Sequence, residues 1–437
     1  MRYLLIGLFI GLFPQFLSAQ NELLQSGPML GYVEMREALI WVQTTEAAEV
    51  KVGYRPVGTT EALLFTDSKA TLKSEAYTAK LIADQVQPGI TYDYTVFINN
   101  EEVKLPYPTQ FSTQPIWRWR TDPPAFNVAL GSCFYINEAA YDRPGDGYGS
   151  EYEIITSIHE KLPNLMVWLG DNTYLREPDW YTQTGVFHRY THTRSVAELQ
   201  PLLANTHHYA IWDDHDYGPN NADRTFVQKE LTTKAFDLFW GNLTCGLPGM
   251  GGITSMFRYN DVDFFLLDNR YFRTPNDQKR DDNRTVLGEE QLEWLIESLV
   301  FSNASYKMVC IGGQVLNTVE RFETYQNLAP KERAYLLRRI EEEGIKNVVF
   351  LTGDRHHTEL SALELDNGET VYDVTISSLT AGTGRNREEV NDNRVPETLT
   401  VQHNFGILEF SGDRVDRKLV IKVYDKDGEL LWERSLD

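Results

Sequence analysis

The chain has 437 residues, enough for two or three domains, and its 42% hydrophobic and 24% charged residues are typical of a globular protein. Its formal net charge is −22, with 63 acidic against 41 basic residues, which argues against nucleic acid or an anionic lipid surface as the main partner. A small anionic substrate would be repelled overall, so binding one needs local cations, either metal ions or clustered arginines.

The N-terminus has the pattern of a secretory signal. Arg2 precedes an apolar run from Leu4 to Leu17, and Ser18-Ala19-Gln20 offers small residues for cleavage. Because the run contains a proline and is short for a membrane span, we expect a signal peptide over residues 1–19 rather than an uncleaved anchor. We therefore expect an exported protein, periplasmic or extracellular, whose signal peptide is cleaved near Ala19. We expect no transmembrane segment after the cleavage.

Residues 24–114 have an all-β pattern. Apolar and polar residues alternate at 38–43, 49–54 and 91–97, with turn residues between these runs. This spacing predicts a small N-terminal β-sandwich resembling a fibronectin type III domain. It could bind carbohydrate or act as a packing and spacer module. Residues 115–124, rich in Trp and Pro, are expected to be a linker.

Residues 125–437 alternate strands with helices, which predicts a layered α/β domain. Strands are expected at 126–133, 165–171, 209–214, 262–268, 306–312, 347–353 and 371–377. Helical periodicity covers 151–162, 288–301 and 331–343. Residues 406–410, 418–424 and 430–433 are predicted to be antiparallel strands that complete a second sheet.

Several of these buried strands are followed by residues that can bind a metal ion. The groups are Cys133, Gly170-Asp171-Asn172-Thr173-Tyr174, Asp213-Asp214-His215-Asp216 and Gly353-Asp354-Arg355-His356. Open α/β sheets place their sites at the carboxyl ends of strands. Three carboxylates around one imidazole would repel one another unless a cation neutralises them. The simpler alternatives are an Asp-Asn turn with a packed tyrosine at 171–174 and an exposed acidic loop at 213–216.

The three cysteines cannot all pair within one chain. Cys310 lies in a strand-like run and is expected to be a small buried residue. Cys245 lies in a loop, and Cys133 at a strand end is the candidate ligand. A disulfide from Cys245 to Cys133 or to Cys310 is the alternative.

Taken in order, these motifs resemble the metallophosphoesterase superfamily, and within it the alkaline phosphatase D (PhoD-like) family. The resemblance rests on Gly131-Ser132-Cys133, Gly170-Asp171-x-x-Tyr174, Asp214-His215, Gly312-Gly313-Gln314 and Gly353-Asp354-x-His356, and it spans nearly the whole mature chain. It implies a four-layer α/β/β/α sandwich with a two-metal centre between the sheets, preceded here by the fibronectin type III-like sandwich.

The resemblance also implies which side chains bind the two metals. The first metal is expected on Cys133, Asp171, Tyr174 and His356. The second is expected on Asp171, Asp214 and Asp354, with Gln314 or Asn220. The wider superfamily usually has an Asp-x-His pair on its first strand and a histidine where Gln314 stands, so the identity of the second metal is open.

The donor types suggest which ions these are. Phenolate and thiolate donate strongly to an electron-poor ion, which favours Fe³⁺ over Zn²⁺ at the first site. The Gly-Asp-x-x-Tyr arrangement is similar to that of purple acid phosphatases, which have a tyrosinate-iron centre. An oxygen-rich second site suits Ca²⁺ or another divalent ion such as Mg²⁺.

Two metals at bridging distance predict a mechanism. They clamp the phosphate oxygens while a metal-bound hydroxide attacks phosphorus in line. His215 would stabilise or protonate the departing oxygen. Arg270 and Arg273 could bind the non-reacting oxygens or pair with Asp268, and Arg355 is an alternative. The loop from residue 381 to 396 could cap the site or be a surface loop.

We therefore expect an exported metal-dependent phosphoric ester hydrolase, a phosphomonoesterase, a phosphodiesterase or both. Its substrate would be a small-molecule phosphate ester, with no nucleic-acid-binding surface. Sequence does not rank monoester against diester, because pocket shape decides it. The alternative is a cell-surface binding protein in which a degenerate metallophosphatase domain is only a scaffold.

Overall fold

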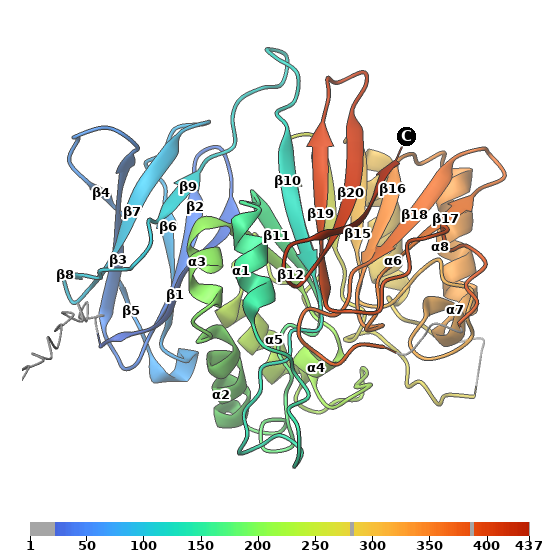
Figure 1. Ribbon diagram of the computed structural model, residues 1–437, viewed down its shortest axis with the longest axis horizontal. Coiled ribbons are helices and arrows are strands. Elements are labelled where there is room, and N and C mark those ends of the chain that lie inside the picture. Colours follow the sequence, from blue (N-terminus) through green and yellow to red (C-terminus); the bar gives the residue numbers. More distant parts are fainter. Residues whose placement is uncertain (1–21, 280–283, 385–388, 437) are drawn as a thin grey trace, which may run out of the picture.

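A computed structural model describes residues 22–279, 284–384 and 389–436 (Figure 1). The predicted signal peptide, residues 1–19, lies outside the described residues. Across the described ranges, no helix combines the length and the apolar character needed to cross a membrane.

One large sheet extends through most of the molecule. Within the described residues it has nine strands in the order β21-β20-β19-β10-β11-β12-β1-β2-β6. Their bounds are β21 (Leu430–Leu436), β20 (Lys418–Asp425), β19 (Asn404–Ser411), β10 (Phe126–Gly131), β11 (Leu165–Leu169), β12 (His207–Ile211), β1 (Leu24–Val33), β2 (Ala38–Thr44) and β6 (Thr78–Ala83). The neighbours β10, β11 and β12 are parallel, and every residue of β11 is buried, which explains its continuous apolar sequence.

A second sheet of six strands faces the first. Its order is β13-β14-β15-β16-β18-β17. The bounds are β13 (Ser255–Tyr259), β14 (Val262–Leu266), β15 (Tyr306–Cys310), β16 (Val348–Thr352), β18 (Thr370–Thr375) and β17 (Glu359–Glu364). Aromatic rings fill the space between the two sheets: Tyr209 of β12 stacks on Phe257 of β13 with 3.6 Å between ring centroids.

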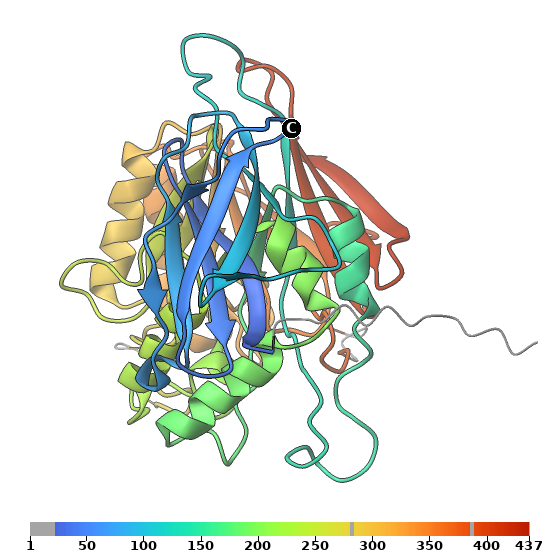
Figure 2. The same cartoon turned by 90° about the vertical axis from the view of Figure 1, so that its left-hand side faces the viewer.

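Helices cover the outer faces of both sheets and complete four layers (Figures 1 and 2). The helices α1 (Glu153–Glu160) and α3 (Leu199–Asn205) contact the nine-stranded sheet. The helices α6 (Glu289–Phe301) and α8 (Pro330–Glu342) share a separate apolar core with the outer face of the six-stranded sheet. The shorter or connecting helices are α2 (Gln183–Arg194), α4 (Asp214–Tyr217), α5 (Lys229–Phe239), α7 (Tyr325–Leu328) and the 3₁₀ turn at Lys73–Glu75. The predicted α/β/β/α sandwich is confirmed.

The N-terminal β region is joined to the large sheet. A further sheet contains β4 (Leu64–Phe65), β3 (Glu49–Pro56), β7 (Thr91–Ile98) and β8 (Glu101–Glu102), with β5 (Lys69–Ala70) and β9 (Gln110–Ser112) paired beside it. The strands β1, β2 and β6, however, belong to the nine-stranded sheet, because β1 pairs with β12 at Leu30 and His207. The division at 24–114, 115–124 and 125–437 stays a prediction.

The three terminal strands complete the sheet that contains β10. β19 pairs with β10 in antiparallel register, and Phe126 stacks on Phe410 with 4.6 Å between ring centroids. The turn between β19 and β20, residues 412–417, therefore lies beside the amino end of β10. The loop after Gly131 lies at the opposite end of that strand.

Candidate metal centre

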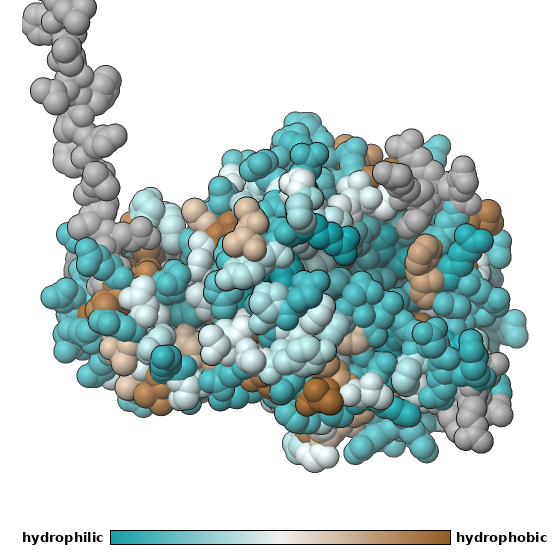
Figure 3. All heavy atoms as spheres, turned by 90° about the horizontal axis from the view of Figure 1, so that it is seen from below, coloured by the Kyte–Doolittle hydropathy of each residue, from teal (hydrophilic) through white to brown (hydrophobic). Residues whose placement is uncertain are grey.

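The predicted ligands follow the carboxyl ends of neighbouring strands and meet at the lower end of the molecule in Figure 1. Four of them have left-handed backbone angles: φ is 57° at Cys133, 53° at Asp171, 63° at Asp354 and 55° at His356. Residues other than glycine rarely adopt this conformation, and where they do they cluster at functional sites. The chain therefore turns sharply after β10, β11 and β16, and these turns bring the side chains of the predicted ligands toward one another. Seen from this end, the surface is mostly hydrophilic (Figure 3).

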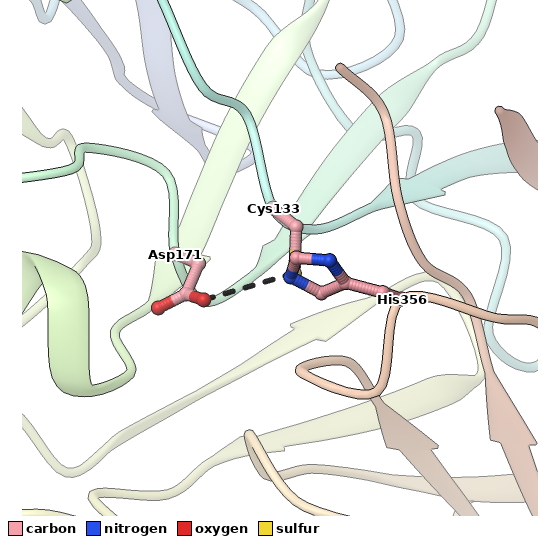
Figure 4. Close-up of side chains that lie close together, drawn as sticks. All are labelled: Cys133, Asp171 and His356. Atoms are coloured by element: carbon pink, nitrogen blue, oxygen red, sulfur yellow. Dashed lines mark hydrogen bonds between the residues drawn. The ribbon is translucent and has the colours of Figure 1, made fainter. Parts of the chain in front are cut away.

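The first group of donors contains Cys133, Asp171 and His356 (Figure 4). One ligand atom from each lies within 4.8 Å of the others, and the Cys133 Sγ is 3.7 Å from Asp171 Oδ2. The Tyr174 hydroxyl donates to the same carboxylate oxygen at 3.1 Å. A thiol, a carboxylate, an imidazole and a phenol thus converge, and their role as ligands of one ion stays a prediction.

The His356 ring is held in one orientation. Its Nδ1 donates to the carbonyl oxygen of Gly382, and the Tyr148 hydroxyl lies 3.3 Å from the same nitrogen. Burial lowers the pKa of His356, which favours the neutral imidazole. A neutral ring that donates through Nδ1 leaves the Nε2 lone pair free for a metal ion.

Two further groups are rich in carboxylates. Asp171, Asp214 and His215 form one, and Asp213, Asp214 and Asp354 form the other. Asp171 therefore belongs to the thiol-containing group and to a carboxylate group at the same time. The Asn221 backbone N–H donates to Asp214 Oδ2 at 2.6 Å. The peptide group that joins Asn220 to Asn221 therefore lies beside the predicted second site.

The electrostatic surroundings of these carboxylates disfavour their charged forms and would favour a nearby cation. Burial, reinforced by the neighbouring carboxylates, raises the pKa of Asp171 and of Asp354 well above the ordinary range. Burial raises the pKa of Cys133 and Tyr174 in the same way. Burial would also raise that of Asp214, but His215 and Arg270 outweigh it and lower the pKa. A bound cation would favour the ionised form of all these groups.

One buried carboxylate oxygen that lacks a hydrogen-bond partner also fits a bound cation. Asp213 Oδ1 accepts from Asn269 at 2.8 Å and from Arg270, but the fully buried Oδ2 has no hydrogen-bond partner among the described residues. Buried carboxylate oxygens are rarely left unpaired. The donor set and this orphaned oxygen both fit divalent or trivalent ions at the centre.

The Gln314 side chain is hydrogen-bonded at both ends of its amide. Its Nε2 donates to Glu359 at 2.8 Å and to Thr375 at 2.9 Å, and its Oε1 accepts from Asn317 and Arg355. Both ends of the amide are therefore used within a buried polar network. Gln314 as a metal ligand stays a prediction that these contacts do not support.

The predicted arginines have carboxylate partners. Arg270 is fully buried, pairs with Asp213 and Glu323, and lies 3.8 Å from Asp214. Arg273 also pairs with Glu323 and not with Asp268, which instead accepts backbone N–H groups and the Trp212 indole. Arg355 pairs with Glu389 at 2.7 Å. The predicted contact of Arg270 and Arg355 with substrate stays a prediction.

Sequence reasoning missed three residues of the site. Asp213 belongs to the acidic motif at 213–216, but only Asp214 was chosen as a ligand. Glu323 lies in a loop between β15 and α7, and nothing in its local sequence indicates that it joins two buried arginines. Tyr148 lies on the loop between β10 and α1, where no periodicity reveals that it reaches His356.

The remaining sequence predictions near the site have mixed outcomes. The predicted strand at 209–214 ends at Ile211, because Asp213 caps the short helix α4 that begins at Asp214. Cys133, Cys245 and Cys310 are all free, so neither alternative disulfide forms. Part of the predicted cap, residues 385–388, lies outside the described residues.

Facing sheets with metal-binding side chains at their strand ends define a metallophosphoesterase-like fold, and comparison with known proteins places the chain more narrowly. A family model described as PhoD-like phosphatase matches residues 131–413. The chain belongs to this family. A second model, described as a domain of unknown function (DUF7800), matches residues 21–116.

A curated relative agrees with this assignment, and solved structures share the fold. Alkaline phosphatase D of Bacillus subtilis (strain 168) is 24% identical over 349 residues, which cover 68% of this chain and 56% of that protein. The chain thus spans little more than half of this curated relative's length. A structure of PhoD aligns with a TM-score of 0.77 and 18% identity, covering 95% of this chain and 92% of that one. The purple acid phosphatase PPD1 from yellow lupin aligns with a TM-score of 0.65 and 13% identity, covering 94% and 74%.

Proposed function

We propose that this protein is an exported, metal-dependent hydrolase of small phosphate esters. The observation that supports the proposal most is that Asp171 belongs to two donor groups at once. A single carboxylate placed in this way suits two neighbouring cations, the arrangement used for in-line displacement at phosphorus. The alternative of a degenerate scaffold is less well supported, because the donor residues are present and gathered at the strand ends.

We further propose which residues bind each ion. Cys133, Tyr174 and His356, with Asp171, would bind Fe³⁺, since a phenolate and a thiolate favour an electron-poor ion. Asp214 and Asp354, with Asp171 and the unpaired oxygen of Asp213, would bind Ca²⁺ or another divalent ion through oxygen. When bound, the ions supply Lewis acidity toward the phosphate oxygens.

His215 would hold a proton for the departing oxygen. It is only half-buried, its ring stacks on Tyr174 with 4.3 Å between centroids, and one ring nitrogen lies within 4.8 Å of oxygens of Asp171 and Asp214. A partly exposed imidazole beside buried carboxylates can reach a substrate that enters from solvent. Its proton would pass to the leaving-group oxygen as the phosphorus–oxygen bond breaks.

Arg270 would act on the site through the carboxylates it touches. It is fully buried between Asp213 and Glu323, so it fixes the orientation of Asp213 and offsets part of the negative charge near Asp214. Glu323 in turn holds both Arg270 and Arg273. Arg355, placed between two ligand positions and paired with Glu389, remains the better candidate for contact with substrate oxygens.

The decisive experiment for this proposal is a rate measurement with purified mature protein. p-Nitrophenyl phosphate and bis(p-nitrophenyl) phosphate would be compared before chelation, after chelation and after metal is restored. We expect turnover that is lost with the chelator and recovered with the metals, and the ratio of the two rates decides between monoester and diester preference. Turnover of neither substrate, or turnover that the chelator leaves unchanged, would refute the proposal.

Export is tested separately. N-terminal sequencing of protein recovered outside the cytoplasm should begin near Gln20. Recovery of Met1 from that fraction would show that no signal peptide is removed.

A further inference from the structure

The most exposed large apolar side chains gather at the end of the molecule opposite the metal centre. Among the described residues, the three highest exposed fractions in this class are 91% for Phe301, 89% for Trp119 and 88% for Val415. Each lies just before or beside the amino end of a strand: Trp119 precedes β10, Phe301 ends α6 before β15, and Val415 lies in the turn between β19 and β20. Both cartoon views show the segment before β10 and this turn extending together at the top (Figures 1 and 2).

The three segments contact one another around a hollow of about 620 Å³. The Arg118 guanidinium reaches Asn303, two residues beyond Phe301, at 3.5 Å. The backbone N–H of Arg414, next to Val415, donates to Asp122 at 3.2 Å. The exposed apolar residues are thus separate tips around a shared polar floor, and they do not form a continuous apolar patch.

The floor of this hollow carries positive charge. In the part of the chain that the structure describes, the side chains of Arg118, Arg120 and Arg414 form no ion pair, and Arg118 lies within 6.0 Å of the indoles of Trp117 and Trp119.

The carboxylates beside the hollow have other partners. Asp122 and Asp413 accept backbone N–H groups. Asp261 pairs with Arg417, and Asp416 lies 3.5 Å from the Lys418 ammonium. Arg118 donates to Asn303 at 3.5 Å and Arg120 to the Arg118 carbonyl at 3.2 Å, and because an arginine has five N–H groups, the three guanidiniums keep donors that can bind phosphate oxygens.

We propose that this end of the molecule docks on the surface of a phospholipid bilayer. Tryptophan and phenylalanine at isolated tips suit the boundary between headgroups and acyl chains, and arginines set behind them suit the phosphates. A fluid surface accepts separate tips, whereas a protein partner would need a complementary solid surface at each. Because the chain's net charge of −22 repels anionic lipid at long range, the surface inferred is one of zwitterionic phospholipid.

This docking fixes the orientation of the enzyme. Strand β10 leads from the Trp119 segment to Cys133, and its six residues span roughly 20 Å. The metal centre would therefore face away from the bilayer, toward esters in solution. The proposal does not depend on the proposed activity, since it rests on the opposite end of the fold.

The test is flotation of the mature protein with phosphatidylcholine vesicles. The variant Trp119→Asn/Phe301→Gln removes two tips, with asparagine chosen because Trp119 has φ +61° and asparagine tolerates that conformation. We expect the unaltered protein to bind and this variant to bind at least about tenfold more weakly. The matched variant Phe322→Asn/Val227→Thr removes exposed apolar side chains from segments after β15 and β12, and should bind like the unaltered protein.

A second variant, Arg118→Gln/Arg120→Gln/Arg414→Gln, tests the guanidiniums without touching the apolar tips. It should weaken vesicle binding, while the melting temperature stays close to that of the unaltered protein. Failure of the unaltered protein to bind vesicles would overturn the proposal and leave a protein partner as the explanation of the tips. Equal vesicle binding by the Trp119→Asn/Phe301→Gln variant and its matched control, Phe322→Asn/Val227→Thr, would overturn it as well.

Discussion

At the scale of single residues, the site depends on side chains whose chemistry would be unfavourable elsewhere. Asp171 and Asp213 are buried carboxylates and Asp354 is a half-buried one, and ligand oxygens of these residues lie within a few ångströms of one another or of Asp214. Burying charged groups without compensation costs several kcal/mol each, so a protein retains such a group only where something neutralises it. The thiol and the phenol beside Asp171 add donors that packing alone does not require.

His215 has two candidate roles that a single variant distinguishes. If it acts on substrate, His215→Ala should lower turnover by about 10²–10⁴-fold with metal content unchanged. The loss should be smaller for aryl esters, whose leaving groups need less protonation, than for alkyl esters. Loss of metal together with activity would identify His215 as a ligand instead, whereas equal losses for both ester types would count against protonation of the leaving group.

Tyr174 tests the identity of the first ion. We expect protein purified from its native host to contain iron and to absorb visible light through charge transfer from phenolate, with Tyr174→Phe shifting or abolishing the band. Tyr135→Phe is the control, because its ring lies 5.0 Å from that of Tyr174 while its hydroxyl bonds to Asp142. A colourless, fully active preparation without iron would contradict the assignment.

At the scale of elements, the ends of the buried strands were the features that could best be predicted from the sequence. Buried parallel strands have continuous apolar sequences, so the abrupt change to Asp171 or Asp354 was visible without a structure. Helix α2 was not predicted, because its buried face includes Arg189 and Arg194 and so lacks apolar periodicity. Arg189 is held there by Asp179 at 2.8 Å.

The parts of the site that were not predicted depend on pairing across long sequence distances. Glu323 meets Arg270 from 53 residues away, and Gln314 meets Glu359 from 45. Local patterns do not encode such partners. The resemblance pointed to the strand-end motifs together, yet it could not reveal that both ends of the Gln314 amide are hydrogen-bonded within the protein.

Gly170 tests how closely the strand ends must approach. Its φ is +93°, and a Cβ there would lie 2.8 Å from the Asp213 Cβ. Gly170→Ala should therefore destabilise the fold by roughly 1–3 kcal/mol and disturb metal binding. Gly58→Ala is the matched control, since φ is +76° and no atom lies within 4 Å of the added Cβ. Equal melting temperatures for the two variants would show that close packing at Gly170 is unimportant.

At the scale of the whole molecule, the two facing sheets bring strand ends from distant parts of the chain to one edge. The opposite edge carries the exposed tips at Trp119, Phe301 and Val415. Strands β1, β2 and β6 of the N-terminal β region extend the same nine-stranded sheet, and β1 joins it through its pairing with β12.

Stability of the metal-free protein should depend on pH in a definite direction. Burial and mutual repulsion raise the pKa of Asp171 and Asp354 in the folded protein, so above the ordinary carboxyl value of 3.8 the folded state binds more protons than the unfolded state. The free energy of unfolding therefore falls as pH rises from there, whereas the lowered pKa of Asp214 acts only below 3.8. Bound metal replaces those protons, so the gap in melting temperature between metal-loaded and metal-free protein should widen toward alkaline pH. A gap independent of pH would contradict this account.

The central claim is that one carboxylate serves two cations, and the direct test is elemental analysis of Asp171→Asn beside its rate. Asparagine keeps the size of the side chain and removes its charge. We expect this variant to lose metal at both sites and its phosphatase activity to disappear with the metal. Asp237→Asn, an exposed residue 56% accessible and paired with Lys80, should keep both. Full metal content in Asp171→Asn with only a modest loss of rate would contradict the shared site.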